Sequence, residues 1–140
     1  MKKIVAVFLI LSTILYANRA DELKAILLEA ITSVLNGNRN IGVYIQDERY
    51  ERLKPYFRHI KMVNRCEEAQ MVFAKDIKEL PKECLEKKIF ATRYSTYKKN
   101  KDVVMGAFFW QKGRPTILFN KKVLRKFHIV LPDKFKKYEQ

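Results

Sequence analysis

Two apolar, aromatic-rich runs separated by a short turn dominate the hydrophobic pattern of this chain. They cover residues 103–111 and 116–120, and the turn reads Lys-Gly-Arg-Pro. The pattern predicts a β-hairpin, because Gly113 can adopt the positive φ of a tight turn and Pro115 suits the start of a strand. Both faces of the first run are apolar, with Met105, Ala107 and Phe109 on one and Val104, Phe108 and Trp110 on the other. A strand with two apolar faces is normally covered on both, so we expect this hairpin in the core.

The rest of the pattern alternates helix and strand. Residues 21–35 carry one apolar stripe at helical spacing, made of Leu23, Ile26, Leu27, Ala30, Ile31, Val34 and Leu35. Asn18 or Asp21 can cap the start of this helix, and Gly37 fits just past its end. Short apolar runs predict strands at residues 41–45, 59–63, 69–74 and 88–92, and short helices at 48–56, 76–85, after Asn120 and after Pro132. The sequence therefore predicts a small three-layer α/β domain, a mostly parallel sheet with a C-terminal antiparallel β-hairpin and flanking helices.

Residues 1–17 are typical of a signal peptide. Lys2 and Lys3 precede an apolar run over residues 4–16, which is shorter than the roughly 20 residues that span a bilayer. Ala17 is small enough for the last position before a cleavage site. We therefore expect export to the periplasm, with residues 18–140 forming a single α/β domain. An uncleaved anchor helix is the alternative.

Basic residues concentrate in the second half of the chain, whose total net charge is +14. Residues 18–80 hold 11 Lys or Arg against 10 acids, whereas residues 81–140 hold 16 against 5. Export argues against nucleic acid as the partner of this surface, and favours an anionic lipid, an anionic ligand or an acidic protein. A surface that only keeps the protein soluble is the alternative.

Few side chains are suited to catalysis. His59 and His128 do not share a metal-ligand spacing, and the four glycines form no phosphate-binding loop. His128 lies between Phe127 and Ile129, which predicts a partly buried structural residue. The sequence predicts neither an enzyme nor a cofactor or metal site.

Cys66 and Cys84 are the two cysteines of the chain, and each precedes a predicted strand. If those strands are parallel neighbours, both cysteines lie at the same end of the sheet, within reach of a disulfide. Closing this 18-residue separation would stabilise the fold by about 3 kcal/mol. Two buried thiols, or one reactive thiol, are the alternatives.

A candidate binding site lies at the carboxyl edge of the predicted sheet, where open α/β folds bind ligands. The loop over residues 93–101 follows one strand, and Tyr44 to Asp47 end another. Arg93, Ser95 and Tyr97 could bind an anionic group between them. Adding the basic and hairpin residues gives the candidate partner-binding set Tyr44, Gln46, Asp47, Arg93, Ser95, Tyr97, Lys98, Trp110 and Arg114. An ordinary exposed loop is the alternative.

Residues 106–131 carry a recognisable order of features. A glycine and an aromatic strand lead to a Gly-Arg turn, a strand ending in Phe-Asn, a helix and an apolar segment; the residues are Gly106, Phe108, Gly113, Arg114, Phe119, Asn120, Leu124, Ile129 and Leu131. In these residues, and in outline over most of residues 18–140, the chain resembles the YfiR-like family of small periplasmic proteins. The chain departs from the family where Pro132 and Asp133 replace a usual serine pair, and in having only two cysteines.

The resemblance implies an α/β fold, no enzymatic activity and, as in many family members, a homodimer. It also implies a regulatory role, because the name-giving member restrains an inner-membrane diguanylate cyclase through its periplasmic part. We therefore expect a non-enzymatic periplasmic interaction or regulatory protein with a protein partner in the periplasm or inner membrane. The alternative is a small binding module for an anionic ligand or an anionic envelope surface.

Overall fold

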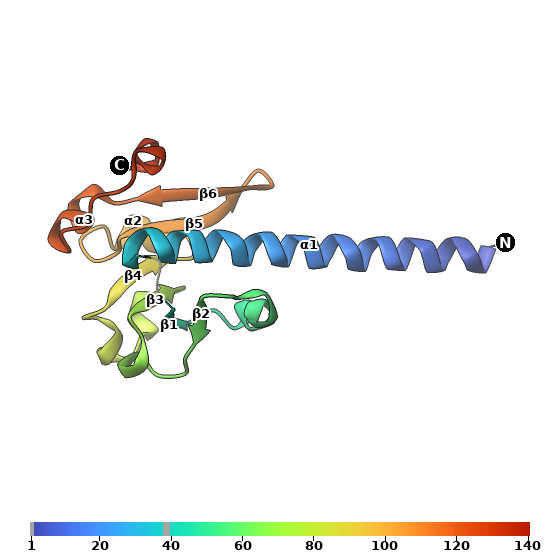
Figure 1. The fold of residues 1–140 in the computed structure, drawn as a ribbon, viewed down its shortest axis with the longest axis horizontal. Helices are drawn as coiled ribbons and strands as arrows, with labels where there is room; N and C mark the ends of the chain where they lie inside the picture. Colours follow the sequence, from blue (N-terminus) through green and yellow to red (C-terminus); the bar gives the residue numbers. More distant parts are fainter. Residues whose placement is uncertain (1, 38–39) are drawn as a thin grey trace.

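A computed structural model describes residues 2–37 and 40–140 of the protein, with side chains from residue 19 onward. Six strands form one sheet in the order β2-β1-β3-β4-β5-β6 (Figure 1). Their bounds are β1 Ile41–Ile45, β2 Ile60–Met62, β3 Met71–Ala74, β4 Lys88–Ala91, β5 Gly106–Gln111 and β6 Arg114–Phe119. Neighbouring strands from β2 to β5 pair in parallel, and β5 and β6 pair antiparallel. The predicted α/β fold with its closing hairpin is confirmed.

Three α-helices and five 3₁₀ segments surround the sheet in the described part of the chain. They are α1 Lys2–Asn36, η1 Glu48–Tyr56, η2 Cys66–Glu68, η3 Ile77–Glu79, η4 Lys82–Cys84, α2 Tyr94–Lys99, α3 Lys121–Lys126 and η5 Asp133–Tyr138. The helices predicted at residues 48–56 and 76–85 are therefore 3₁₀ turns, and Pro55 and Pro81, which lack an N–H, disfavour longer helices there. The stretch over residues 93–101, predicted to be a loop, is largely the helix α2.

The helix predicted at residues 21–35 belongs to α1, which already begins at Lys2, so Asn18 and Asp21 do not cap it. Gly37 ends the helix as predicted, with φ +79° and its N–H donated to the carbonyl oxygen of Ser33. Among the described residues, no helix has the length and apolar character needed to cross a membrane. The side chains around Ala17 lie outside the described set, so cleavage after this residue stays a prediction.

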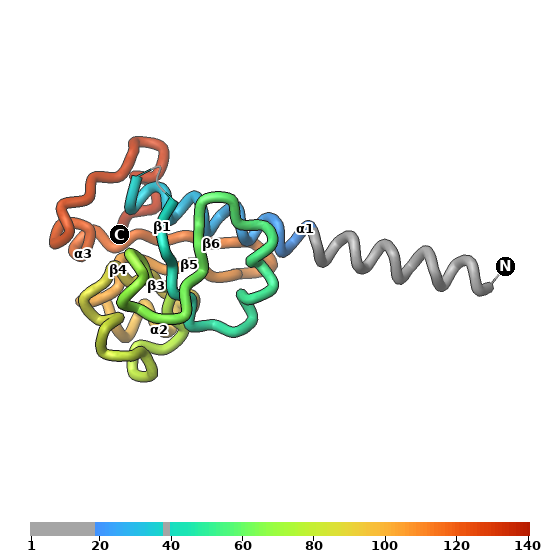
Figure 2. Tube along the Cα trace, turned by 60° about the horizontal axis from the view of Figure 1, so that its bottom comes forward, coloured from blue at the N-terminus to red at the C-terminus, as the bar shows by residue number. Residues whose placement is uncertain are grey.

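The two faces of the sheet bury different side chains, which makes the domain three-layered (Figures 1 and 2). On one face, Phe73, Phe90 and Phe108 pack beneath α1, and the Phe73 and Phe90 rings meet edge to face at 5.9 Å between centroids. On the other face, Val72, Ala74, Ile89, Ala91 and Ala107 pack with Tyr97 of α2 and the two cysteines. Because strand side chains alternate between faces, successive residues of β3 and β4 enter opposite cores.

The buried stripe of α1 differs from the predicted one. Ala25, Leu28, Ile31 and Leu35 are buried, whereas Leu23 is 44% and Ile26 is 56% exposed. The helix carries apolar residues over more than one face, so spacing alone did not fix its rotation. Packing against the sheet and η1 selects the face that is buried.

The hairpin turn places Lys112 at φ 51° and Gly113 at φ 76°. Two consecutive positive φ values are those of a type I′ turn, which suits the strand twist. Pro115 is the second residue of β6 and lies opposite Trp110, at a position where its missing N–H faces the outer edge. The Gln140 N–H, donated to the Phe119 carbonyl oxygen at 2.8 Å, covers the other end of that edge.

The strand alternation predicted from residue 103 begins only at Gly106. Val104 and Met105 precede β5, so Met105 packs with Phe108 and Val104 packs with Ala107, opposite to the prediction. Asn120 precedes α3 without a side-chain cap, and its Nδ2 donates to the carbonyl oxygens of Lys101 and Val104.

Cys66 and Cys84 form the predicted disulfide, with 5.1 Å between their Cα atoms. Both are buried, at 2% and 0% exposure. They lie in η2 and η4, just before β3 and β4, and these strands are parallel neighbours. The bridge therefore joins the amino ends of the two central strands.

Candidate functional site

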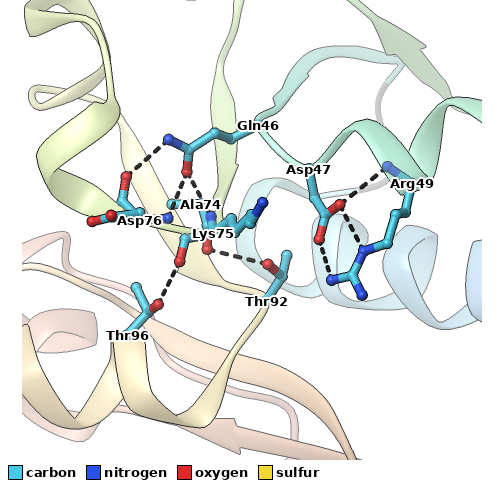
Figure 3. A network of polar contacts seen from close by, with 8 residues as sticks. All are labelled: Gln46, Asp47, Arg49, Ala74, Lys75, Asp76, Thr92 and Thr96. Atoms are coloured by element: carbon cyan, nitrogen blue, oxygen red, sulfur yellow. Dashed lines mark hydrogen bonds and ion pairs between the residues drawn. The ribbon is translucent and has the colours of Figure 1, made fainter.

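In a sheet of this kind, a binding site is expected at the carboxyl edge of the parallel strands. The chain runs outward from β1 in both directions, to β2 on one side and through β3 to β5 on the other. In such sheets, ligands bind beyond the carboxyl ends of the strands where the order reverses, here β1 and β3. Residues at and after the ends of those two strands, together with Thr92 and Thr96 after β4, are drawn in Figure 3.

Gln46, directly after β1, bonds to the loop that follows β3. Its side-chain Oε1 accepts the backbone N–H groups of Lys75, at 2.6 Å, and of Asp76, at 2.7 Å. Its Nε2 donates to the carbonyl oxygen of Asp76 at 2.9 Å (Figure 3). All these bonds are internal, so Gln46 ties the loop after β3 to β1.

Asp47 is also engaged within the protein. Its side chain is 2% exposed, and its carboxylate accepts hydrogen bonds from Arg49 Nη2 at 2.7 Å and Nε at 3.0 Å. The Arg49 backbone N–H donates to the same carboxylate at 3.1 Å, which caps η1. The Arg49 side-chain hydrogen bonds hold the pKa of the Asp47 carboxyl below its usual range, against the opposing effect of burial.

Replacing Asp47 with asparagine is expected to lower the free energy of unfolding by about 1.5–3 kcal/mol at neutral pH, the usual contribution of hydrogen bonds to charged groups. Because the folded-state pKa is depressed, this contribution is present above the unfolded value of about 3.9 and is lost as pH falls through the folded-state pKa. Urea unfolding of both proteins, followed from neutral to acidic pH, should show the gap closing in acid.

Asp133→Asn is the control for Asp47→Asn, because the Asp133 side chain is 96% exposed and pairs with the nearby Lys136. Exposed pairs of this kind contribute at most about 1 kcal/mol. A variant Asp47→Asn as stable as the unmodified protein at neutral pH would contradict the structural role of the carboxylate.

A pocket opens one strand further along the edge, between the loop after β3 and α2. Its volume is about 430 Å³, and its lining residues are Lys75, Asp76, Lys78, Arg93, Ser95, Thr96, Lys99 and Asn100. Four of these are cationic and one is a carboxylate, whose Oδ1 accepts the backbone N–H of Lys78. Among the described side chains, none of the four cations forms an ion pair with a carboxylate. The pocket therefore carries an excess of positive charge, although Lys75 also acts on the Asp47 carboxylate and helps to lower its pKa.

Hydrogen bonds fix both walls of this pocket. The Thr96 hydroxyl, in a side chain only 7% exposed, donates to the carbonyl oxygen of Lys75 at 2.5 Å (Figure 3). Asn100 Nδ2 donates to the Thr96 carbonyl oxygen at 2.8 Å, and the Thr92 hydroxyl donates to the Ala74 carbonyl oxygen at 3.3 Å. These bonds hold α2 against the end of β3, so the pocket is part of the folded framework.

Of the candidate residues near this edge, Arg93 and Ser95 line the pocket. Tyr97 points into the core at 3% exposure, where burial raises the pKa of its phenol, and Tyr44 packs against the same core. Lys98 is exposed on α2 but does not line the pocket. The structure thus brings together only two of the residues that the sequence grouped as an anion site.

Trp110 and Arg114 lie on the hairpin, and neither lines the pocket. The Trp110 ring is 41% exposed, and Lys24 Nζ lies 5.7 Å from its centroid and 5.5 Å from that of Tyr50. Burial between these rings lowers the pKa of the Lys24 ammonium. Trp110 therefore contributes to the contact between α1 and the hairpin.

Three lining residues of the pocket, Lys75, Asp76 and Lys78, were not predicted from the sequence. Thr96, Lys99 and Asn100 lie within the predicted loop over residues 93–101, although no role was assigned to them. The signal that could have found the first three is that they follow the strand at residues 69–74. The carboxyl-edge rule applies to that strand as it does to its neighbours.

Neither metal ligation nor similarity to known proteins indicates the function. Within the described part of the chain, no group of three or more His, Cys, Asp or Glu side chains could hold a metal ion. No protein-family model matches this chain, and neither a curated protein nor a solved structure matches it. What the protein binds must therefore be inferred from its own residues.

Proposed function

We propose that this protein is a non-enzymatic binding protein that takes an anionic group into the pocket between the loop after β3 and α2. The observation that carries the proposal is the set of four cations, Lys75, Lys78, Arg93 and Lys99, around a pocket with one carboxylate. Like charges gathered without salt bridges of their own repel one another, and an anion bound among them relieves that repulsion.

The residue types suit an oxyanion such as a carboxylate or phosphate. The planar guanidinium of Arg93 can donate two parallel hydrogen bonds to one oxyanion, while lysine ammonium groups act as mobile point charges. The exposed Ser95 hydroxyl lies among the lining residues as a further donor. A volume of about 430 Å³ lies within the range of small-molecule sites, which favours a small metabolite with an anionic group over a bare ion.

Export to the periplasm belongs to the same proposal. Disulfides persist in oxidising compartments, so the bridge between Cys66 and Cys84 supports it, as does the signal-peptide pattern of residues 1–17. The resemblance of residues 106–131 to the YfiR-like family supports a regulatory role. In that role, the protein acts on a partner in the periplasm or inner membrane, including the periplasmic part of a signalling protein, and forms a homodimer as many members do.

Titration calorimetry with inorganic phosphate, pyrophosphate and citrate tests the pocket. The sample is protein recovered from the extracytoplasmic fraction, and sequencing of its N-terminus should first show a start near Asn18. Arg93→Ala or Lys99→Ala is expected to weaken binding of the best anion by roughly 10- to 100-fold, the range for hydrogen bonds to charged groups.

Lys98→Ala is the matched control for Lys99→Ala, because both lysines are exposed on α2 and only Lys99 lines the pocket. Lys98→Ala should change the affinity by less than about twofold. Equal weakening by the two variants would mean that general charge attraction, and not the pocket, holds the anion, which would contradict the proposal. No binding of any of the three anions would overturn it as well.

A further inference from the structure

The C-terminal segment after β6 forms a lobe that is strongly basic. This basic lobe, residues 121–140, holds seven Lys or Arg against two acids. It closes on itself where the Lys121 N–H donates to the Gln140 carbonyl oxygen at 3.0 Å. Figures 1 and 2 show it at one side of the molecule, beside the end of the hairpin strands that leads into α3. It shares no residue with the basic pocket on α2.

The turn after α3 has a defined geometry. His128 adopts a left-handed conformation with φ 56°, and its N–H donates to the Arg125 carbonyl oxygen at 3.1 Å. The Ile129 N–H donates to the Leu124 carbonyl oxygen at 2.9 Å. Together these bonds make a Schellman motif, with histidine where glycine is usual. His128 is exposed, so its predicted partial burial is wrong.

This turn displays an apolar side chain at its tip. Ile129 packs partly buried against the core and Leu131 is 2% exposed, so the extended chain between them directs Val130 outward. Val130 is 82% exposed, and Phe127, on the other side of His128, is 38% exposed. The inward-facing side chains of Ile129 and Leu131, with the left-handed turn at His128, thus hold Val130 in solvent.

Cations flank this apolar tip. Lys121, Lys122, Arg125 and Lys126 are all exposed on α3, the helix that leads into the turn. Lys122 pairs with Asp102 at 2.6 Å, but both side chains are more than half exposed, so that pair is weak. Among the described residues, Lys121 and Arg125 form no ion pair.

We propose that the basic lobe docks on an anionic phospholipid bilayer, with Val130 entering the interface and the α3 cations, Lys121 and Arg125 foremost, binding lipid phosphates. Val130 is 82% exposed, and a protein partner would need a fitted pocket to bury a single protruding valine. A bilayer interface accepts apolar side chains without such a fit, and each nearby Lys or Arg adds about 1 kcal/mol of attraction. Charge and apolar display therefore both favour lipid over an acidic protein.

A fluorescent reporter at the tip tests this docking. Val130→Trp in a Trp110→Phe background gives one tryptophan, at a position exposed enough to leave the fold intact, which a thermal melt by circular dichroism verifies. Its emission should shift to the blue on vesicles containing phosphatidylglycerol, and should not shift on pure phosphatidylcholine. The sample is protein recovered from the extracytoplasmic fraction that starts near Asn18, because the apolar residues 4–16 would bind vesicles of either composition by themselves.

Removing cations from α3 should weaken vesicle binding strongly, whereas removing cations elsewhere should weaken it little. Lys121→Gln with Arg125→Gln should raise the lipid concentration at half-shift by roughly 25-fold, or fivefold per cation. Lys61→Gln with Lys82→Gln removes the same charge from exposed positions in β2 and η4, and should change the midpoint by less than about threefold. Equal effects of the two pairs would overturn the proposal, as would the absence of any blue shift. A shift with polyglutamate but not with vesicles would instead assign the lobe to an acidic protein.

Discussion

Replacing Gly106 with alanine is expected to lower the free energy of unfolding by about 3–5 kcal/mol, a large part of the stability of a domain this size. A Cβ at this position would collide with the carbonyl oxygen of Leu118 and lie 2.6 Å from Phe90 Cε2. Neither neighbour can withdraw, because Leu118 belongs to the paired strand β6 and Phe90 is fully buried against Phe73 and Phe119. Urea unfolding followed by circular dichroism measures the loss.

Gly113→Ala separates this steric effect from the general effect of removing a glycine. Gly113 has φ +76° and nothing within 4 Å of an added Cβ, so alanine there meets only backbone strain, about 1–2 kcal/mol. If the two variants lose similar stability, the close approach of β5 to β6 and Phe90 is not the reason for glycine at position 106. If Gly106→Ala does not fold at all, the lower limit of the prediction is met.

Removing the disulfide is expected to lower the free energy of unfolding by about 3 kcal/mol, because the bridge restricts the unfolded chain over a separation of 18 residues. The variant is Cys66→Ala with Cys84→Ala, which avoids leaving one unpaired thiol. Since both cysteines are buried in the core that also holds Val72 and Ile89, the small loss of packing adds to the effect. Urea unfolding under non-reducing conditions gives the comparison.

Reduction of the unmodified protein is the control for the double alanine variant, and the two samples should unfold at similar urea concentrations. Thiol labelling of unfolded, unreduced protein should detect no free thiol. Two labelled cysteines would contradict the bridge. A dimer that separates only on reduction would place the disulfide between two chains instead of within one.

Local patterns were sufficient for much of the fold. Short apolar runs located β1, β3 and β4 because a strand buried on both faces needs few residues and little else. The Gly113 turn predicted the hairpin, since a two-residue turn with positive φ strongly favours it. The spacing of the cysteines before two strands predicted the disulfide, because adjacent parallel strands begin at the same edge of a sheet.

The sequence was thus sufficient to predict the main strands, a mostly parallel sheet with a closing hairpin, and the disulfide. Tertiary structure decided which polar side chains are available to a ligand. Gln46 and Asp47 looked like ligand-binding residues, yet Gln46 bonds a loop 29 residues away and Asp47 is held by Arg49. Asp47 is satisfied locally, by Arg49 two residues further along the chain. For Gln46, whether the polar group is satisfied internally depends on partners distant in sequence, which no local pattern reports. The rotation of α1 and the outward display of Val130 were decided in the same way, by what the rest of the chain packs against.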